Sequence, residues 1–158
     1  MVYIRTKKIN NGLYAYLVES KNTPAGPRQK VKQYLGKITA LQLQNNSPRS
    51  EIKTKSQREF VIELVKRELQ RHGFSENKHF FQYEDIIFSL QELTIKKNNK
   101  ETILHLNQGF LNTYTLQRLF SFKKTKDHTS DAPLLAKYFL EAGLPLSQQE
   151  FVQFYQLL

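Results

Sequence analysis

The chain has no cysteine and no tryptophan, and it contains a single methionine. Without cysteine, disulfide scaffolds, thiol catalysis and zinc ribbons are excluded. No apolar run approaches the roughly 18 residues that a membrane-spanning helix needs. Residues Met1–Asn10 lack the apolar stretch of a signal peptide. We therefore expect a soluble, cytoplasmic protein without a membrane partner.

Glycine, histidine and aspartate are also scarce, and their positions do not form a recognisable catalytic pattern. The six glycines are scattered, so there is no phosphate-cradling loop. None of the four histidines pairs with another at helical metal-binding spacing. Glu84 and Asp85 are adjacent and point in different directions on a strand, so they are no carboxylate pair. We expect a protein that is not an enzyme and that has no metal site and no cofactor.

Positive charge is abundant, and it is unevenly distributed. The 158 residues carry 24 Lys and Arg against 14 Asp and Glu, a net charge of +10. The first 58 residues hold 12 of the basic residues and only two acids, Glu19 and Glu51, whereas the remainder is neutral. A basic block before a neutral body is typical of a module that contacts phosphates. The alternative is a solvated face that only aids solubility.

The N-terminal residues predict a three-stranded antiparallel β-meander. Residues 2–8 alternate apolar and basic side chains, and the Asn11-Gly12 pair that follows is a strong hairpin turn signal. Residues 13–20 read as the second strand, residues 21–27 as a loop with two prolines, and residues 28–35 as the third strand.

Period-2 geometry assigns the faces of this meander. A two-residue turn at Asn11-Gly12 sets Lys7 opposite Tyr16 and Arg5 opposite Val18. The third strand is expected to add its cations and Tyr34 to the same outer face. The candidate nucleic-acid-binding residues are Tyr3, Arg5, Lys7, Tyr14, Tyr16, Arg28, Lys30, Lys32 and Tyr34. Such a face would neutralise phosphates and stack bases. Alternatively, Tyr14 and Tyr16 are only β-formers that pack on lysine stems.

The order YAYLVES, a Gly/Pro loop, RQKVKQYLGK over residues 14–37 resembles the small N-terminal module of a group of insertion-sequence transposases. It also resembles the start of many short, mostly archaeal proteins without assigned function. The resemblance covers about the first 37 residues and implies a nucleic-acid-handling context. The nuclease domain of those transposases is much longer and uses spaced carboxylates on metal ions. Only 100 residues follow Arg58, so catalysis is not implied.

The remaining chain predicts a linker and a second module. Residues 38–55 are polar and contain Pro48, as in a flexible connection. Helices are expected over residues 57–72, 109–122, 134–142 and from Ser147 to the end. Residues 91–97 and 101–106 predict a hairpin, and residues 80–90 fit either a strand with a helical turn or a helix. The predicted fold is α+β: a basic β-meander (1–37), a linker (38–55) and a mostly helical body with one β-hairpin (56–158).

These observations favour a non-enzymatic nucleic-acid-binding protein. The choice between DNA and RNA stays open: the resemblance leans to DNA, whereas the tyrosine-rich face tolerates single strands of either kind. The first alternative is an adaptor whose basic face binds an acidic protein, and the second is an enzyme whose site the sequence does not reveal. The body would give stability or bind a protein partner. Lys123, Lys124 and Lys126 form a second basic cluster, which is either a solvated loop or an extension of the N-terminal surface.

Overall fold

The computed structural model describes residues 1–45, 50–125 and 127–158. Within these ranges the chain forms nine strands and four helices. They are β1 (Val2–Ile9), β2 (Gly12–Thr23), β3 (Gly26–Ala40), α1 (Gln57–Arg71), β4 (Ser75–Glu76), β5 (Phe80–Tyr83), β6 (Ile86–Ser89), β7 (Thr94–Lys97), β8 (Lys100–Leu106), β9 (Gly109–Leu111), α2 (Thr113–Phe120), α3 (His128–Glu141) and α4 (Gln148–Leu157).

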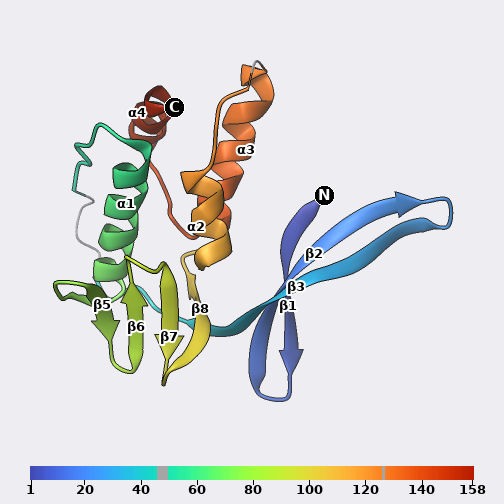
Figure 1. Ribbon diagram of the computed structural model, residues 1–158, viewed down its shortest axis with the longest axis horizontal. Helices are drawn as coiled ribbons and strands as arrows, with labels where there is room; N and C mark the ends of the chain where they lie inside the picture. Colours follow the sequence, from blue (N-terminus) through green and yellow to red (C-terminus); the bar gives the residue numbers. More distant parts are fainter. Residues whose placement is uncertain (46–49, 126) are drawn as a thin grey trace.

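Strands β1, β2 and β3 form a β-ribbon that projects from a body made of the other elements (Figure 1). The strand order is β1-β2-β3-β8-β7-β6-β5-β4, with β9 paired to β8. Strand β8 is the junction of the two parts. Its residues Thr102–His105 pair in parallel with Lys37–Ala40 of β3, whereas β7 and β9 pair with it antiparallel. Residues 38–40, expected in the linker, therefore belong to β3.

The predicted mostly helical body is wrong, because strands occupy most of residues 75–111. Residues 80–90 form two paired strands, β5 and β6, and the segment expected as a helix from Gly109 begins as β9. The physical reason is alternation: Phe81, Ile86 and Phe88 are buried while their strand neighbours are not. Left-handed residues at Glu84 and Asn107 supply tight turns that the sequence did not signal clearly.

The three-stranded N-terminal sheet is confirmed, but its first turn is displaced by one residue and its second loop is shorter than expected. Residues 21–27 do not form a loop. Instead β2 runs to Thr23, β3 begins at Gly26, and only Pro24 and Ala25 turn the chain. The first turn consists of Asn10 and Asn11, with Ile9 opposite Gly12.

The predicted helix ends depend on capping residues, and two of them are confirmed. Ser56 caps α1 by accepting from the Glu59 N–H, and Ser147 with Glu150 forms a complete capping box for α4. Asn112 caps α2 in a box with Thr115 that the sequence analysis missed. Helix α3 begins at His128 and not at the expected Leu134, and Asp127 caps its N-terminus.

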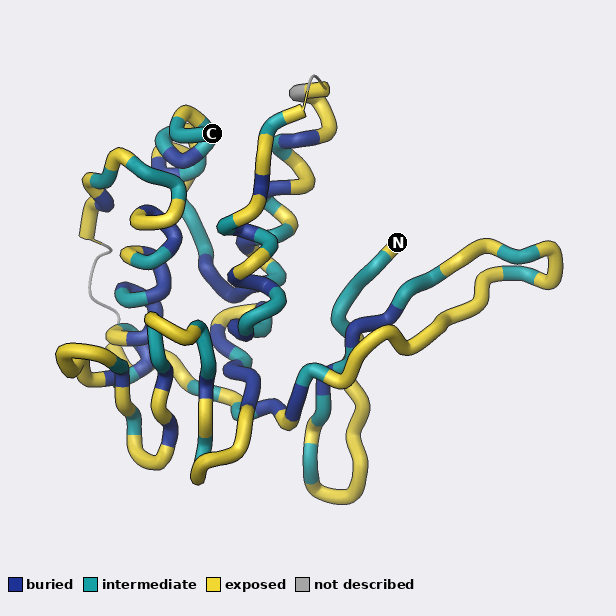
Figure 2. Tube along the Cα trace, viewed as in Figure 1, coloured by how far each residue is buried: buried dark blue, intermediate teal, exposed yellow. Residues whose placement is uncertain are grey.

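Two hydrophobic clusters hold the molecule together. The larger lies between the helices and the body strands and includes Phe60, Phe88 and Phe154. The smaller joins the ribbon to the body through Ala15 of β2, Ile38 of β3 and Ile103 of β8. Beyond this junction most of the ribbon is exposed (Figure 2). The ribbon is thus anchored at this junction, and its two hairpin turns project into solvent in different directions (Figure 1).

A buried ionic network ties helices α1 and α4 together. The Arg67 guanidinium donates to the Glu150 carboxylate and to the Ser50 carbonyl. Burial alone would raise the pKa of Glu150, but hydrogen bonds from Arg67 and Ser147 outweigh it and hold that pKa below its ordinary value. Glu68, which is fully buried, accepts from Arg71 and from Asn107 in the turn between β8 and β9. Each member has a structural role, because it links elements distant in sequence.

Candidate nucleic-acid interface

The first hairpin places five of the predicted site residues on one face. Arg5 lies opposite Tyr16, Lys7 opposite Tyr14, and Tyr3 opposite Val18. The expected pairs, Lys7 with Tyr16 and Arg5 with Val18, are wrong because the turn is Asn10-Asn11. The slip amounts to two residues, and side chains alternate with period 2, so the faces are as predicted.

Two β-bulges in the third strand change which of its side chains point to each face of the ribbon. The pairing shifts between Ala15 and Tyr16 and again between Leu17 and Val18, so that β3 contains two extra residues. Between the shifts Tyr34 lies opposite Tyr16; beyond the second shift Val31 lies opposite Val18. Each bulge reverses the alternation of the strand that carries it.

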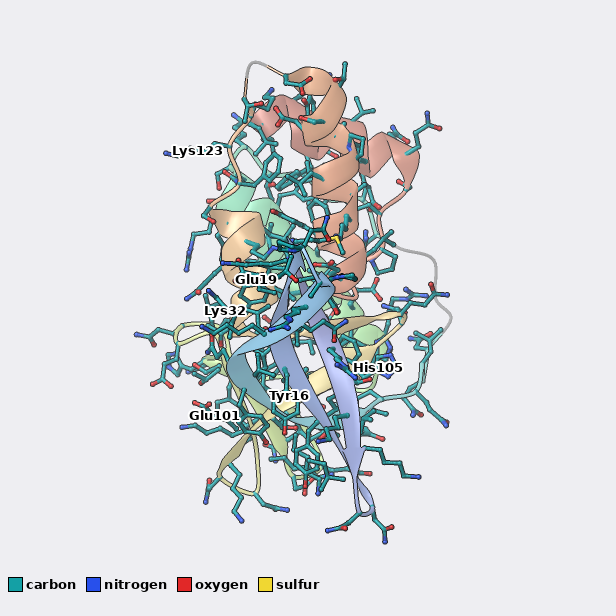
Figure 3. All side chains as sticks on the ribbon, turned by 90° about the vertical axis from the view of Figure 1, so that its right-hand side faces the viewer. Tyr16, Glu19, Lys32, Glu101, His105 and Lys123 are labelled. Atoms are coloured by element: carbon teal, nitrogen blue, oxygen red, sulfur yellow. The ribbon has the colours of Figure 1, made fainter. Side chains whose placement is uncertain are left out.

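The predicted cations of β3 therefore lie on the other face. Arg28 pairs opposite Lys21, and Lys30 opposite Glu19. The Lys32 ammonium is 3.4 Å from the Glu19 carboxylate. Figure 3 shows Lys32 and Glu19 together, with Tyr16 lower on the ribbon. The single nine-residue surface expected from the sequence is thus not formed: Arg28, Lys30 and Lys32 are separated from the tyrosines.

We call the opposite face of the ribbon the tyrosine face, and it carries Tyr3, Arg5, Lys7, Tyr14, Tyr16 and Tyr34. Three of its tyrosines, Tyr14, Tyr16 and Tyr34, lie close together. The ring centroid of Tyr34 lies 5.3 Å from that of Tyr16 and 6.4 Å from that of Tyr14. Tyr34 is 53% exposed. Partial burial raises the pKa of Tyr34, and the hydroxyls of Tyr14 and Tyr16 raise it further. The phenol is therefore neutral at physiological pH and offers both a π face and an O–H donor.

A groove of about 820 Å³ begins at the tyrosine face and crosses onto the body. Tyr14, Tyr34 and Lys37 come from the ribbon, whereas Lys97 and Lys100 come from the hairpin of β7 and β8. We call it the lysine groove. Lys97 lies 3.8 Å from Asp85, but neither Lys37 nor Lys100 forms an ion pair within the described part of the chain. None of these three lysines was predicted from the sequence as a site residue. Lys37 lies opposite Tyr14 across β2 and β3, whereas only the pairing of β3 with β8 brings Lys97 and Lys100 beside the tyrosines.

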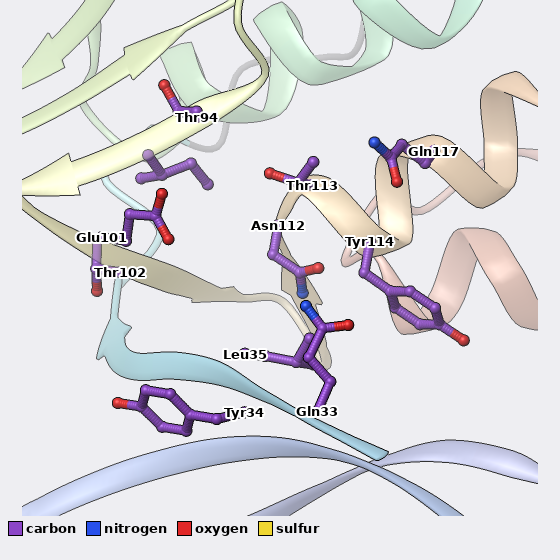
Figure 4. A pocket seen from close by; sticks show the side chains of 11 residues that line it. Gln33, Tyr34, Leu35, Thr94, Glu101, Thr102, Asn112, Thr113, Tyr114 and Gln117 are labelled. Carbon is purple, nitrogen blue, oxygen red and sulfur yellow. The ribbon is translucent and has the colours of Figure 1, made fainter.

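A smaller cavity of about 190 Å³ adjoins this groove. In Figure 4, Gln33, Tyr34 and Leu35 of β3 lie on one side, and Asn112, Tyr114 and Gln117 lie at the start of α2 on the other. Glu101 and Thr102 of β8 complete it and also line the lysine groove. We call it the amide cavity, after Gln33, Asn112 and Gln117. No sequence motif signalled it.

The second basic cluster lies apart from this surface. The Lys124 ammonium donates to the Tyr155 carbonyl, 3.0 Å away, and sits 4.8 Å from the centre of the Tyr155 ring. Figure 3 shows Lys123 near the helices, far from Tyr16. Lys126 lies outside the described residues. The described members of this cluster therefore do not extend the ribbon surface.

The other side chains that could bind a metal or act in catalysis either do not cluster or already contact other groups of the protein. Among the residues that the structure describes, no three His, Asp or Glu side chains gather as a metal site would require. His72 is buried, with Nδ1 2.7 Å from the Glu68 carbonyl oxygen, and His105 stacks on Phe110. No helix in the described ranges is long and apolar enough to cross a bilayer.

No family model, curated protein or solved structure matches this chain. The resemblance of residues 14–37 to the transposase module therefore stays a prediction. The ribbon, the groove and the cavity are therefore the features from which a function is inferred.

Proposed function

We propose that this protein binds single-stranded nucleic acid, DNA or RNA, along the tyrosine face and the lysine groove. The observation that carries the proposal is the groove itself. Tyr14 and Tyr34 share it with Lys37 and Lys100, whose ammonium groups have no ion-pair partner in the described ranges. Cations that neutralise phosphates, placed beside rings that stack bases, are the usual elements of single-strand binding.

A single strand fits this surface better than a duplex does. Tyr34 is half exposed and carries two other tyrosine rings beside it. Exposed rings gain stacking energy only from bases that are not already stacked in a helix, about 1–3 kcal/mol for each base. The role we propose is binding, in the cytoplasm, without catalysis.

The test is salt-dependent binding of labelled oligonucleotides, measured by fluorescence anisotropy. For the parent protein we expect affinity to fall about tenfold or more between about 50 and 200 mM salt, since each phosphate contact releases counterions. The double variant K37A/K100A should bind more weakly and with a shallower salt slope.

The matched control is K53A/K78A, which removes the same charge from exposed positions that do not line the groove. This control should change the salt slope little. Equal losses in both double variants would mean that net charge alone drives binding and would overturn the assignment to the groove.

One observation favours the adaptor alternative, in which a basic face meets an acidic protein. Arg28 and Lys30 lie on the ribbon face that lacks the tyrosine cluster, so they are available to a second partner, and Lys32 lies beside them, paired with Glu19. A complex with an acidic protein that R28A/K30A disrupts and K37A/K100A leaves intact would favour this function. Binding of a protein partner by the body stays a prediction.

A further inference from the structure

The amide cavity is too small for a whole ligand of ordinary size. Its volume is about 190 Å³, whereas small-molecule pockets usually measure about 300–1,000 Å³. It opens beside the lysine groove, with which it shares Tyr34, Glu101 and Thr102. A cavity of this size, next to a surface suited to a phosphate chain, has room for one base of a strand whose backbone continues along the groove.

Several polar groups around the cavity are already occupied. The Asn112 side chain accepts from the Thr115 N–H and donates to the Phe110 carbonyl. The Thr113 hydroxyl donates to the Leu93 carbonyl, and the Thr102 hydroxyl to the Lys37 carbonyl. By contrast, the side chains of Gln33, Gln117 and Glu101 form no hydrogen bond or ion pair within the described ranges. Two amides and one carboxylate therefore remain for a ligand.

Of these three side chains, the Glu101 carboxylate says most about which ligand the cavity binds. Lys96 lies opposite it across β7 and β8, and Lys37, Lys97 and Lys100 line the same groove, yet none forms an ion pair with it. A carboxylate repels phosphates, so by itself it weakens binding of a nucleic-acid backbone. A base N–H compensates for this cost, because an ionised carboxylate is purely an acceptor and pairs with donors on a base edge.

We propose, on the basis of the function proposed above, that the amide cavity binds one unpaired guanine of a single strand. Guanine presents two adjacent donors, N1–H and N2–H, which match the two oxygens of the Glu101 carboxylate. The Gln33 and Gln117 amides are the candidate donors to guanine O6, and Tyr34 provides the stacking surface. Adenine and uracil lack such a pair of adjacent donors, so they leave the carboxylate unpaired.

The test compares oligouridines of about 12 nucleotides, with a central guanine, adenine or inosine, and their deoxythymidine counterparts, which separate RNA from DNA. Guanine should bind about tenfold more tightly than adenine, because a good bidentate pair discriminates by about 1–3 kcal/mol. Inosine has no N2–H, so it should lose most of the gain. Glu101→Gln should abolish the preference while the plain oligouridine still binds.

Glu84→Gln is the matched control, since it removes one negative charge from a hairpin turn that does not line the cavity; it should preserve the preference. Equal binding of guanine and adenine, or a preference that survives Glu101→Gln, would overturn the guanine site. If free guanosine monophosphate binds as tightly as the oligonucleotide, the guanine that the cavity binds need not belong to a strand, and that part of the proposal is overturned. In those cases salt-sensitive oligouridine binding would still support the general function, whereas absence of any oligonucleotide binding at low salt would overturn both proposals.

Discussion

Tyr34 lies directly opposite Tyr16 across β2 and β3, and the two ring centroids are 5.3 Å apart. This contact depends on the bulges of β3, which place Tyr34 on the same face as Tyr16 and move its neighbouring cations to the other face. Tyr34 also lines both the lysine groove and the amide cavity. A substitution of Tyr34 therefore best distinguishes stacking on a bound base from packing within the protein.

Tyr34→Leu keeps apolar bulk and removes the π face. If Tyr34 stacks on a base, single-strand affinity should fall about tenfold, and the salt slope should change little, because no phosphate contact is lost. Fluorescence anisotropy across a salt series measures both quantities.

Tyr155→Leu is the control for this change. Tyr155 lies in α4 of the body and lines neither the lysine groove nor the amide cavity, so its replacement should leave affinity nearly unchanged. If Tyr34→Leu binds as well as the parent protein, the tyrosine cluster is structural and the groove acts through charge alone.

Gly109→Ala should destabilise the body strongly. A Cβ at Gly109 would lie 2.2 Å from both the Gly143 nitrogen and the Leu140 carbonyl oxygen, where the end of α3 meets the turn before β9. The backbone fixes the position of a Cβ, and the atoms it would meet are also backbone, so no side-chain rotation relieves the clash. We therefore expect a loss of about 3 kcal/mol in the free energy of unfolding. Urea denaturation monitored by circular dichroism measures it.

Gly26→Ala provides the comparison, because a Cβ there meets nothing within 4 Å and only the positive φ of +100° opposes it. Its cost should be about 1–2 kcal/mol, the penalty of a left-handed backbone for an L-residue. A Gly109→Ala protein as stable as Gly26→Ala would contradict the close packing of α3 against the β8–β9 turn.

Glu150→Gln should make stability less dependent on pH. Arg67 and Ser147 hold the folded-state pKa of Glu150 below its ordinary value, so the carboxylate stabilises the fold above the unfolded pKa of about 4.3. That contribution is lost as the pH falls through the lower folded-state pKa. At pH 7 the variant should be about 3 kcal/mol less stable, because the buried Arg67 loses its hydrogen-bonded carboxylate and keeps only the 3.9 Å contact with Glu68.

The measurement for Glu150 is the free energy of unfolding in urea between about pH 3 and pH 7, the range that spans the carboxyl titration. The gap between the parent protein and Glu150→Gln should narrow toward acid. A gap that stays constant over this range would contradict the role of the ionised carboxylate. Glu51→Gln, at an exposed carboxylate that pairs with Lys53, should show little gap at any pH.

Local signals in the sequence predicted the N-terminal sheet and the start of two helices, but only some of the strands of the body. Alternation and asparagine-rich turns predicted the N-terminal hairpin, and the faces of Tyr14 and Tyr16 came out as expected although the turn is displaced. Ser56 and Ser147 predicted where two helices begin. These features depend on residues within a few positions of one another, so the sequence alone determined them. For residues 80–90 the sequence left a strand with a helical turn and a helix as alternatives, because a short apolar run fits either period, and the second strand was not predicted.

Only the tertiary structure decided how the candidate site is assembled. One bulge, with Lys32 as its extra residue, puts Tyr34 and Lys30 on opposite faces, and the alternation of the sequence does not indicate it. The parallel pairing of β3 with β8 places Lys37 beside Thr102, 65 positions away, and so brings Glu101 and Lys100 to the tyrosines. Such contacts depend on which strand edges remain free once every segment has buried its apolar side chains, and that is a property of the whole chain.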